Sequence, residues 1–177
     1  VGAFGGMGSV DSGVGFGSFR QDHRFVGGEA QVYIDNITLY GQGGYVETAN
    51  DVSGLDDGFF ARGVVRYFPT SDSRIQLEGT YINMDFIDNG SDMEAFSVKG
   101  RYDFTLTGMP IIGDTPIYFG YRGTFRDNCA FGADLDDHTI MVGTSYSFSG
   151  DRLTVDRQGA TLDTPDFAIG CFDQSFG

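Results

Sequence analysis

Long apolar runs are absent from this chain. No segment of its 177 residues approaches the roughly 20 consecutive apolar residues of a membrane helix. The 3.6-residue apolar period of an amphipathic helix also never persists beyond a turn or two. Only 4 residues are Pro, so little interrupts extended structure. Any part of this chain that crosses a membrane is therefore expected to cross it as β-strands.

Basic residues are also scarce. The chain has 11 Lys and Arg against 25 Asp and Glu, which gives a net charge of -14. We expect no nucleic-acid partner, because such partners are bound by clustered Lys and Arg. Nucleotide binding lacks support too, since Gly13, Gly15 and Gly17 lie in a strand-like run that no helix follows.

A strict alternation of apolar and charged residues is the strongest pattern present. Between Phe96 and Phe104 the even positions are Phe, Val, Gly, Tyr and Phe, and the odd positions are Ser, Lys, Arg and Asp. Such strands need one face in an apolar medium and the other in a medium that accepts charge. A lipid-facing barrel with a polar interior meets this need. The alternative is an ordinary antiparallel sheet whose charged face is solvated.

The parity of the strands places six of the eleven basic residues on the polar face, together with three acids. Inside a narrow barrel these charges are expected to pair, because an unpaired buried charge costs several kcal/mol. The interior of eight strands is just wide enough for side chains to fill it, so we expect no wide pore. The predicted lumen charge network is Glu29, Arg62, Arg66, Glu78, Lys99, Arg101, Asp103, Arg122 and Arg126.

Turn signals, such as the two-residue hairpin turn Asp35-Asn36, separate seven predicted strands. These strands are 25–34, 37–47, 58–68, 74–84, 94–104, 116–126 and 138–148. Closed bacterial barrels have an even number of strands, so an eighth is expected at about 10–19. We therefore predict an all-β fold, a closed antiparallel eight-stranded transmembrane barrel over 1–148, with a C-terminal periplasmic tail over 149–177.

Acidic residues crowd the predicted links at 49–57, 85–93 and 127–137, all on one side of the barrel. Longer loops face outward in such barrels, so this acidic rim is expected at the cell surface and both termini in the periplasm. The rim is either simply solvated or holds a divalent cation, since Ca²⁺ and Mg²⁺ prefer carboxylate ligands. No other cofactor is expected. The weak candidate ligands are Asp56, Asp57, Asp134, Asp136 and Asp137.

The segment 141–148, Met-Val-Gly-Thr-Ser-Tyr-Ser-Phe, resembles the terminal-strand signal by which outer-membrane proteins are recognised for assembly. The layout of about 10–148 is similar to the small OmpA/OmpX-type barrels and to bacterial surface-antigen and porin-like proteins. Most such barrels end at the terminal Phe, whereas 29 residues follow Phe148 here. The resemblance implies an outer-membrane address and contact with lipid and lipopolysaccharide. It names no activity. Because the chain starts at Val1, a signal peptide is expected to have been removed.

Catalytic constellations are not found. His138 shares the apolar-face parity of Ile140 and Val142, but no Ser stands two residues away. We expect no enzyme, but a structural or interaction protein of the cell surface. The alternatives are a soluble secreted ligand-binding barrel or sandwich and, less favoured, a lipid-modifying outer-membrane enzyme.

The tail combines a strand-like run at 151–156 with Phe167, Ile169, Phe172 and Phe176. It is either a disordered linker or, as we expect, a segment over 150–177 that is ordered against a protein partner or a second copy. Cys129, in a predicted outer loop, and Cys171 are separated by an apolar band of about 25 Å. No disulfide between them is expected, although each can bond to another molecule.

Overall fold

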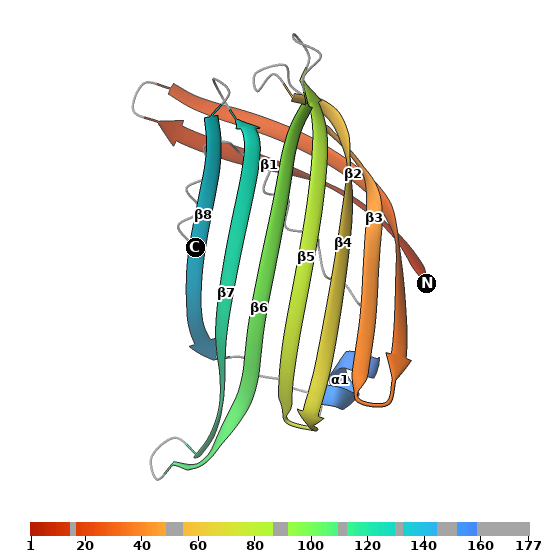
Figure 1. The fold of residues 1–177 in the computed structure, drawn as a ribbon, viewed down its shortest axis with the longest axis vertical. Coiled ribbons are helices and arrows are strands. Elements are labelled where there is room, and N and C mark those ends of the chain that lie inside the picture. The colour runs from red at the N-terminus through yellow and green to blue at the C-terminus, as the bar shows by residue number, and fades with distance from the viewer. Residues whose placement is uncertain are drawn as a thin grey trace.

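Eight strands and one short helix make up the described part of the chain. The structure is a computed structural model that describes residues 1–14, 17–48, 55–86, 92–109, 113–129, 133–144 and 152–158. All strands lie in one antiparallel sheet, in which each strand neighbours the next in chain order (Figure 1). The elements are β1 (Gly2–Val14), β2 (Gly17–Ile34), β3 (Ile37–Thr48), β4 (Leu55–Thr70), β5 (Ser73–Phe86), β6 (Asp92–Met109), β7 (Gly113–Cys129), β8 (Ala133–Thr144) and α1 (Arg152–Gln158).

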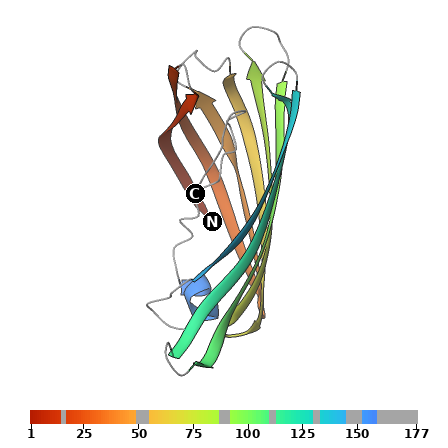
Figure 2. The same ribbon diagram turned by 90° about the vertical axis from the view of Figure 1, so that its left-hand side faces the viewer.

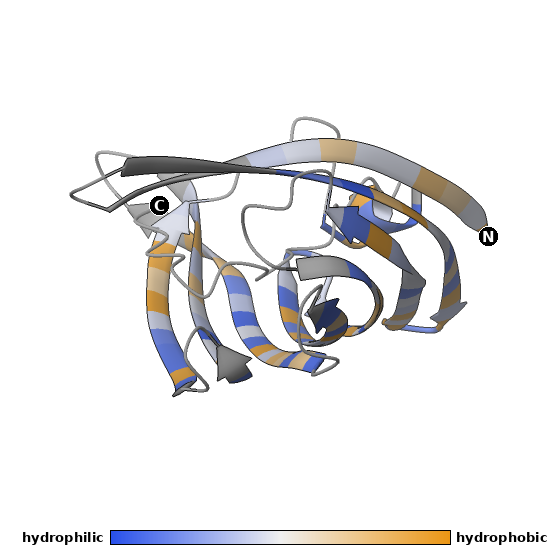
Figure 3. Cartoon of the chain, turned by 90° about the horizontal axis from the view of Figure 1, so that it is seen from above, coloured by the Kyte–Doolittle hydropathy of each residue, from blue (hydrophilic) through white to orange (hydrophobic). Residues whose placement is uncertain are grey.

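The sheet curls strongly, so it has a concave and a convex face (Figures 2 and 3). We call the end that carries the β2–β3 and β4–β5 turns the turn end, and the opposite end the loop end. Helix α1 lies on the concave side at the turn end. Asp35 adopts a φ of 47°, which Asp tolerates and which the tight β2–β3 hairpin turn requires. The predicted turn at 35–36 is thereby confirmed.

The all-β class and the eight antiparallel strands in one sheet are confirmed, but the predicted first strand at about 10–19 is wrong. The chain is already extended from Gly2, and the second strand begins at Gly17. Five of the 13 residues of β1 are Gly. Because Gly is poor in strands, the sequence pattern did not mark this segment as extended.

Closure of the sheet into a barrel is not observed. β1 pairs with β2 and β8 pairs with β7, and no ladder joins β1 to β8 among the residues that the structure describes. Residues 17–22 of β2 pair with β1 but extend past the end of β3. The tip of this hairpin therefore runs obliquely over the open side of the sheet (Figure 3). A glycine-rich strand offers few side chains that would align it beside β8.

Two further expectations fail. Residues 152–158 form the seven-residue helix α1, not part of a short strand. Cys129 is the last residue of β7, opposite Ala133, and not part of a loop. Gly2 pairs with Glu29, so the N-terminal end of β1 lies partway along β2. Within the described part of the chain, no helix has both the length and the apolarity needed to cross a membrane.

An apolar cluster occupies the concave face near the loop end. Its buried members come from four consecutive strands, β3 to β6, and Phe4 and Phe25 pack against it partly buried. Phe4 lies 6.2 Å from Phe25 and 6.1 Å from Phe60, measured between ring centroids. The sequence-based prediction of the barrel interior consisted of charged residues alone, so it did not include this apolar cluster. The buried members are Val46, Phe60, Ile82, Met84, Met93 and Ala95.

Candidate functional site

The convex face exposes apolar side chains in continuous rows across the strands. One row near the turn end crosses β3 to β8, and each member is directly opposite the next. Its neighbour towards the loop end includes Leu77, which is 59% exposed, and Ile140, which is 82% exposed. The row near the turn end consists of Ile37, Tyr67, Ile75, Tyr102, Phe119 and Val142. Apolar residues thus lie on the outside of the curl.

The apolar rows span a band along each strand. On β3 they run from Ile37 to Tyr45, and on β4 from Tyr67 to Phe59. Eight residue steps cover about 27 Å along a strand. If the strands tilted by roughly 40° from a barrel axis, as they do in outer-membrane barrels, the band would be about 20 Å high along that axis. The band is comparable in height to the apolar belt of about 25 Å around outer-membrane barrels.

The concave face carries charge towards the turn end. Arg62 Nε donates to Glu78 Oε1 at 2.8 Å, and Arg62 Nη1 donates to Gln42 Oε1 at 2.9 Å. Gln76 Nε2 donates to Glu78 Oε2 at 3.2 Å. All four side chains are buried, so these hydrogen bonds satisfy charges that would otherwise be costly there.

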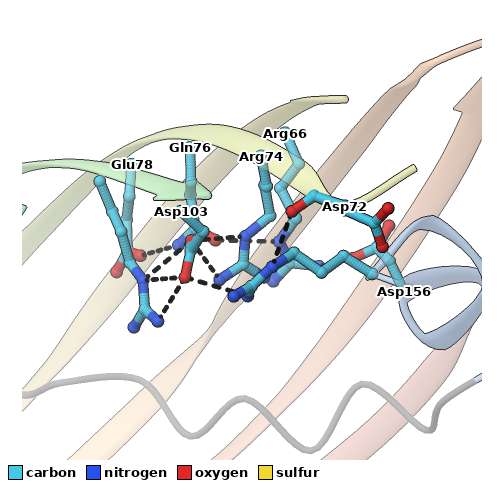
Figure 4. Close-up of polar contacts among 9 residues, drawn as sticks. Arg66, Asp72, Arg74, Gln76, Glu78, Asp103 and Asp156 are labelled. Atoms are coloured by element: carbon cyan, nitrogen blue, oxygen red, sulfur yellow. Dashed lines mark hydrogen bonds and ion pairs between the residues drawn. The ribbon is translucent and has the colours of Figure 1, made fainter. Parts of the chain in front are cut away.

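Asp103 is the centre of a second group of charges on the concave face (Figure 4). Its carboxylate is fully buried and accepts hydrogen bonds from Arg101 Nη2 at 2.7 Å and Arg74 Nη2 at 2.9 Å. Arg152 Nη1 donates to the same carboxylate at 3.1 Å. Three guanidinium groups therefore surround one carboxylate, and Asp103 offsets their mutual repulsion.

Asp156 of α1 joins the helix to the sheet. It accepts hydrogen bonds from Thr38 Oγ1 at 2.6 Å and from Arg66 Nη1 at 2.8 Å. Arg66 Nε donates to Gln76 Oε1 at 3.2 Å, so Asp156 is connected to the network on β5 (Figure 4). The helix is therefore held at the concave face by a buried ion pair.

Arg152 provides the second attachment of α1. Besides Asp103, it donates from Nε to the carbonyl oxygen of Asp72 at 3.2 Å. The amide of Leu153 donates to the carbonyl oxygen of Ser71 at 3.3 Å. Both carbonyls belong to the β4–β5 turn, so α1 closes the turn end beside that hairpin.

The nine residues of the predicted lumen network all lie on the concave face by register. Glu29 accepts hydrogen bonds from Tyr40 and Gln42. Lys99 lies opposite Glu78 on one side and Arg122 on the other. Arg126, which is buried, lies opposite Ala95, nearer the loop end. Arg122 and Arg126 are therefore apart from the Asp103 centre.

The sequence-based prediction of the charge network did not include Arg74, Arg152 and Asp156, which the structure places in it. Arg74 has the same parity as Gln76 and Glu78, so extending the alternation by one step on β5 would have found it. Arg152 and Asp156 are four residues apart, the spacing that puts two side chains on one face of a helix. The strand-like interpretation of the tail concealed that signal.

The acidic residues near the loop end lie mostly within strands. Asp85 is opposite Asp92, Glu94 is opposite Asp127, and Asp57 is opposite Glu47. Like charges directly opposite each other are destabilising.

Among the candidate cation ligands, the side chains of Asp57, Asp134, Asp136 and Asp137 are described. Asp134 and Asp136 are exposed, and Asp137 accepts a hydrogen bond from Thr139 at 3.0 Å. The side chains of Asp56 and Cys129, and all of Cys171, lie outside the described residues, as does 145–148 of the terminal-strand signal. No group of three or more His, Cys, Asp or Glu that could hold a metal ion occurs in the part of the chain that the structure describes.

His138 lies on the convex face with two aromatic neighbours. Tyr121 Oη and His138 Nδ1 are 2.8 Å apart, and the Phe125 ring meets the imidazole edge-on at 5.7 Å. Among the contacts described for His138, the hydroxyl is that of Tyr121, and none is a carboxylate, a Ser or a Thr.

Asp156→Ala is expected to release α1 from the sheet. The change removes the partners of Thr38 and Arg66 and leaves the buried Arg66 charge without its carboxylate. Trypsin should then cleave after Arg152 or Arg157 more rapidly than in the unmodified protein. The matched control is Asp72→Ala, which removes an exposed turn carboxylate but keeps the backbone carbonyl that Arg152 uses. Equal cleavage rates in both variants would contradict the assigned role of Asp156.

Comparison of this chain with protein-family models, with curated proteins and with solved structures found no match.

Proposed function

We propose that this chain is a bacterial outer-membrane β-barrel with a filled lumen that acts as a structural or interaction protein of the cell surface. The observation that supports this proposal is the inverted distribution of side chains on the curled sheet. Apolar rows are exposed on the convex face, while Arg62, Glu78 and Asp103 are buried on the concave face. A soluble sheet buries its apolar face instead.

In this proposal the two open edges of the sheet become paired in the membrane. An unpaired backbone group in hydrocarbon costs several kcal/mol, so lipid does not tolerate a free strand edge. Pairing of β1 with β8 would satisfy both edges and complete the closed eight-stranded barrel. The loop end, with its acidic strand ends, then faces outward beside lipopolysaccharide, and the turn end with α1 faces the periplasm.

The filled interior argues for an anchor or interaction protein rather than a channel. The loop end of the concave face is occupied by the apolar cluster and the turn end by α1 with its ion pairs. A solute would have to displace both. Eight strands also leave an interior that side chains fill.

Folding in the presence and absence of lipid tests the proposal. The urea-unfolded chain should acquire its β circular-dichroism signal and resist protease when it is diluted into phospholipid vesicles, and should aggregate when it is diluted into buffer. A folded, monodisperse protein in buffer without detergent would instead support the soluble ligand-binding barrel.

A further inference from the structure

Three hydrogen-bond donors lie side by side on the concave face at the turn end. We call Tyr33, Thr38 and Arg66 the donor row. Tyr33 on β2 is directly opposite Thr38 on β3, and Thr38 is directly opposite Arg66 on β4. Directly opposite residues have their Cβ atoms about 5 Å apart. Two hydroxyls and a guanidinium are therefore presented together by three consecutive strands.

All three members of the donor row bind the same residue, Asp156 of α1. Thr38 Oγ1 donates to Asp156 Oδ2 at 2.6 Å, and Arg66 Nη1 donates to Asp156 Oδ1 at 2.8 Å. Tyr33 Oη donates to the main-chain carbonyl oxygen of Asp156 in a longer contact of 3.4 Å. Each carboxylate oxygen, and the carbonyl of the same residue, thus has its own donor. The row recognises an aspartate residue and not only a negative charge.

The sheet orients the donor row without help from α1. Arg66 Nε donates to Gln76 Oε1 at 3.2 Å, and the Arg66 guanidinium lies 5.8 Å from the centroid of the Tyr40 ring. Thr38 is fully buried on its strand. Sites built on strands and supported by neighbouring side chains hold their geometry more precisely than sites on loops. We therefore expect the row to keep its arrangement when Asp156 is absent.

Helix α1 is less firmly fixed than the row that it occupies. Ion pairs of Asp156 and Arg152 attach it to the sheet, while Leu153 and Val155 are only half-buried. In a buried ion pair, the desolvation of the two charges offsets much of their attraction. Seven residues are also too few for a helix that is stable alone. Only a small net free energy is therefore expected to hold α1 in place.

We propose that the donor row is a binding site for an acidic peptide, and that α1 is its internal, autoinhibitory occupant. A partner would place the carboxylate of one Asp on Thr38 and Arg66, with the main-chain carbonyl of that Asp at Tyr33. Departure of α1 also takes Arg152 away from Asp103. A basic residue four positions before the Asp would therefore complete the match, since that spacing puts both side chains on one face of a helix. The inference goes beyond the proposed function, because it concerns the concave face in whichever solvent the sheet folds.

Binding of a labelled peptide tests the proposal. The probe is a fluorescein-labelled synthetic peptide with the sequence of residues 152–158. The receptor is the full-length chain with Arg152→Gln and Asp156→Asn, the double variant, in which α1 no longer competes. The peptide should bind the double variant at least about tenfold more tightly than the unmodified protein, in which the site is available for only a fraction of the time. A peptide with Asn in place of its Asp should bind at least about tenfold more weakly.

A matched pair of threonine variants locates the peptide. Thr38→Val, introduced into the double variant, removes one donor of the row and should weaken peptide binding about tenfold. Thr80→Val is the control, because Thr80 is also buried and lies opposite Arg62 on the concave face, away from the row. It should leave the affinity for the peptide unchanged.

Hydrogen exchange tests displacement of α1 in the unmodified protein. The amide of Leu153 donates to the carbonyl oxygen of Ser71 while α1 is docked. Saturating unlabelled peptide should accelerate exchange of this amide at least about tenfold, because amides of undocked segments exchange freely. The peptide with Asn should not accelerate it.

Four results would overturn the proposal. A double variant that binds the peptide no more tightly than the unmodified protein, or Leu153 exchange that the peptide does not accelerate, would show that α1 does not occupy a site for peptides. Equal binding of the Asp and Asn peptides would show that no carboxylate is recognised. Unchanged binding to the Thr38→Val variant would place the peptide away from the donor row. None of these results depends on whether the protein enters lipid vesicles.

Discussion

Arginine in place of Leu77 is expected to destabilise the protein in a bilayer by about 2–4 kcal/mol, the cost of a charge near the midplane on the lipid face of a barrel. Leu77 lies on β5 in the interior of the sheet, and its side chain is 59% exposed on the convex face. In water, the same substitution at an exposed site changes stability by no more than about 0.5 kcal/mol. A convex face in lipid therefore predicts a loss of stability several times larger than a convex face in water does.

Val26→Arg is the matched control for Leu77→Arg. Val26 is an aliphatic residue on the convex face, 62% exposed, and lies opposite Tyr45 at the loop end of the apolar band. At this depth the same charge should cost only about 0–1 kcal/mol. Urea titration of both variants in vesicles measures the difference. Equal costs at the two depths would argue against a bilayer around this face.

Replacing Asp103 by Asn is expected to cost about 3–5 kcal/mol, since removal of one partner leaves buried charges uncompensated. Here three guanidinium groups, those of Arg74, Arg101 and Arg152, would remain close together without a carboxylate. The free energy of unfolding in detergent or lipid measures the loss. Asp134→Asn, at an exposed residue near the loop end, should change it by no more than about 0.5 kcal/mol.

A double-variant cycle shows whether α1 belongs to this network. Arg152→Gln removes one of the three cations around Asp103, so it should recover part of the stability lost in Asp103→Asn. The two changes are then non-additive, as expected for side chains in contact. Strict additivity would mean that Arg152 is not held at Asp103, and α1 would not be part of the folded sheet.

The faces of the strands could be predicted because side chains on a strand alternate strictly. Lys99, Arg101 and Asp103 share a face whatever the curvature of the sheet, and a register slip by one residue would turn every one of them outward. The same rule would have extended the network to Arg74. Alternation does not show towards which end of the sheet a residue lies. Phe60 and Arg62 share the concave face, yet one lies in the apolar cluster and the other in the charge network.

The ends of the chain were harder to predict for a different reason. The seven-residue α1 is too short to be stable alone. Its contacts through Arg152 and Asp156 hold it in place, and such contacts leave only a weak spacing signal. In β1 the glycines remove the alternation itself, so neither its start at Gly2 nor its failure to join β8 was visible in the pattern.

Fluorescence quenching by lipids with brominated acyl chains tests the orientation of the sheet most directly. The chain contains no Trp, so Phe119→Trp and Tyr118→Trp each introduce a single fluorophore. Phe119 is 50% exposed on the convex face, whereas the Tyr118 ring lies on the concave face with the Arg101 guanidinium 3.9 Å from its centroid. An outer-membrane barrel predicts strong quenching of Trp at 119 and little at 118. Equal quenching at both positions, or stronger quenching at 118, would contradict a lipid-facing convex surface.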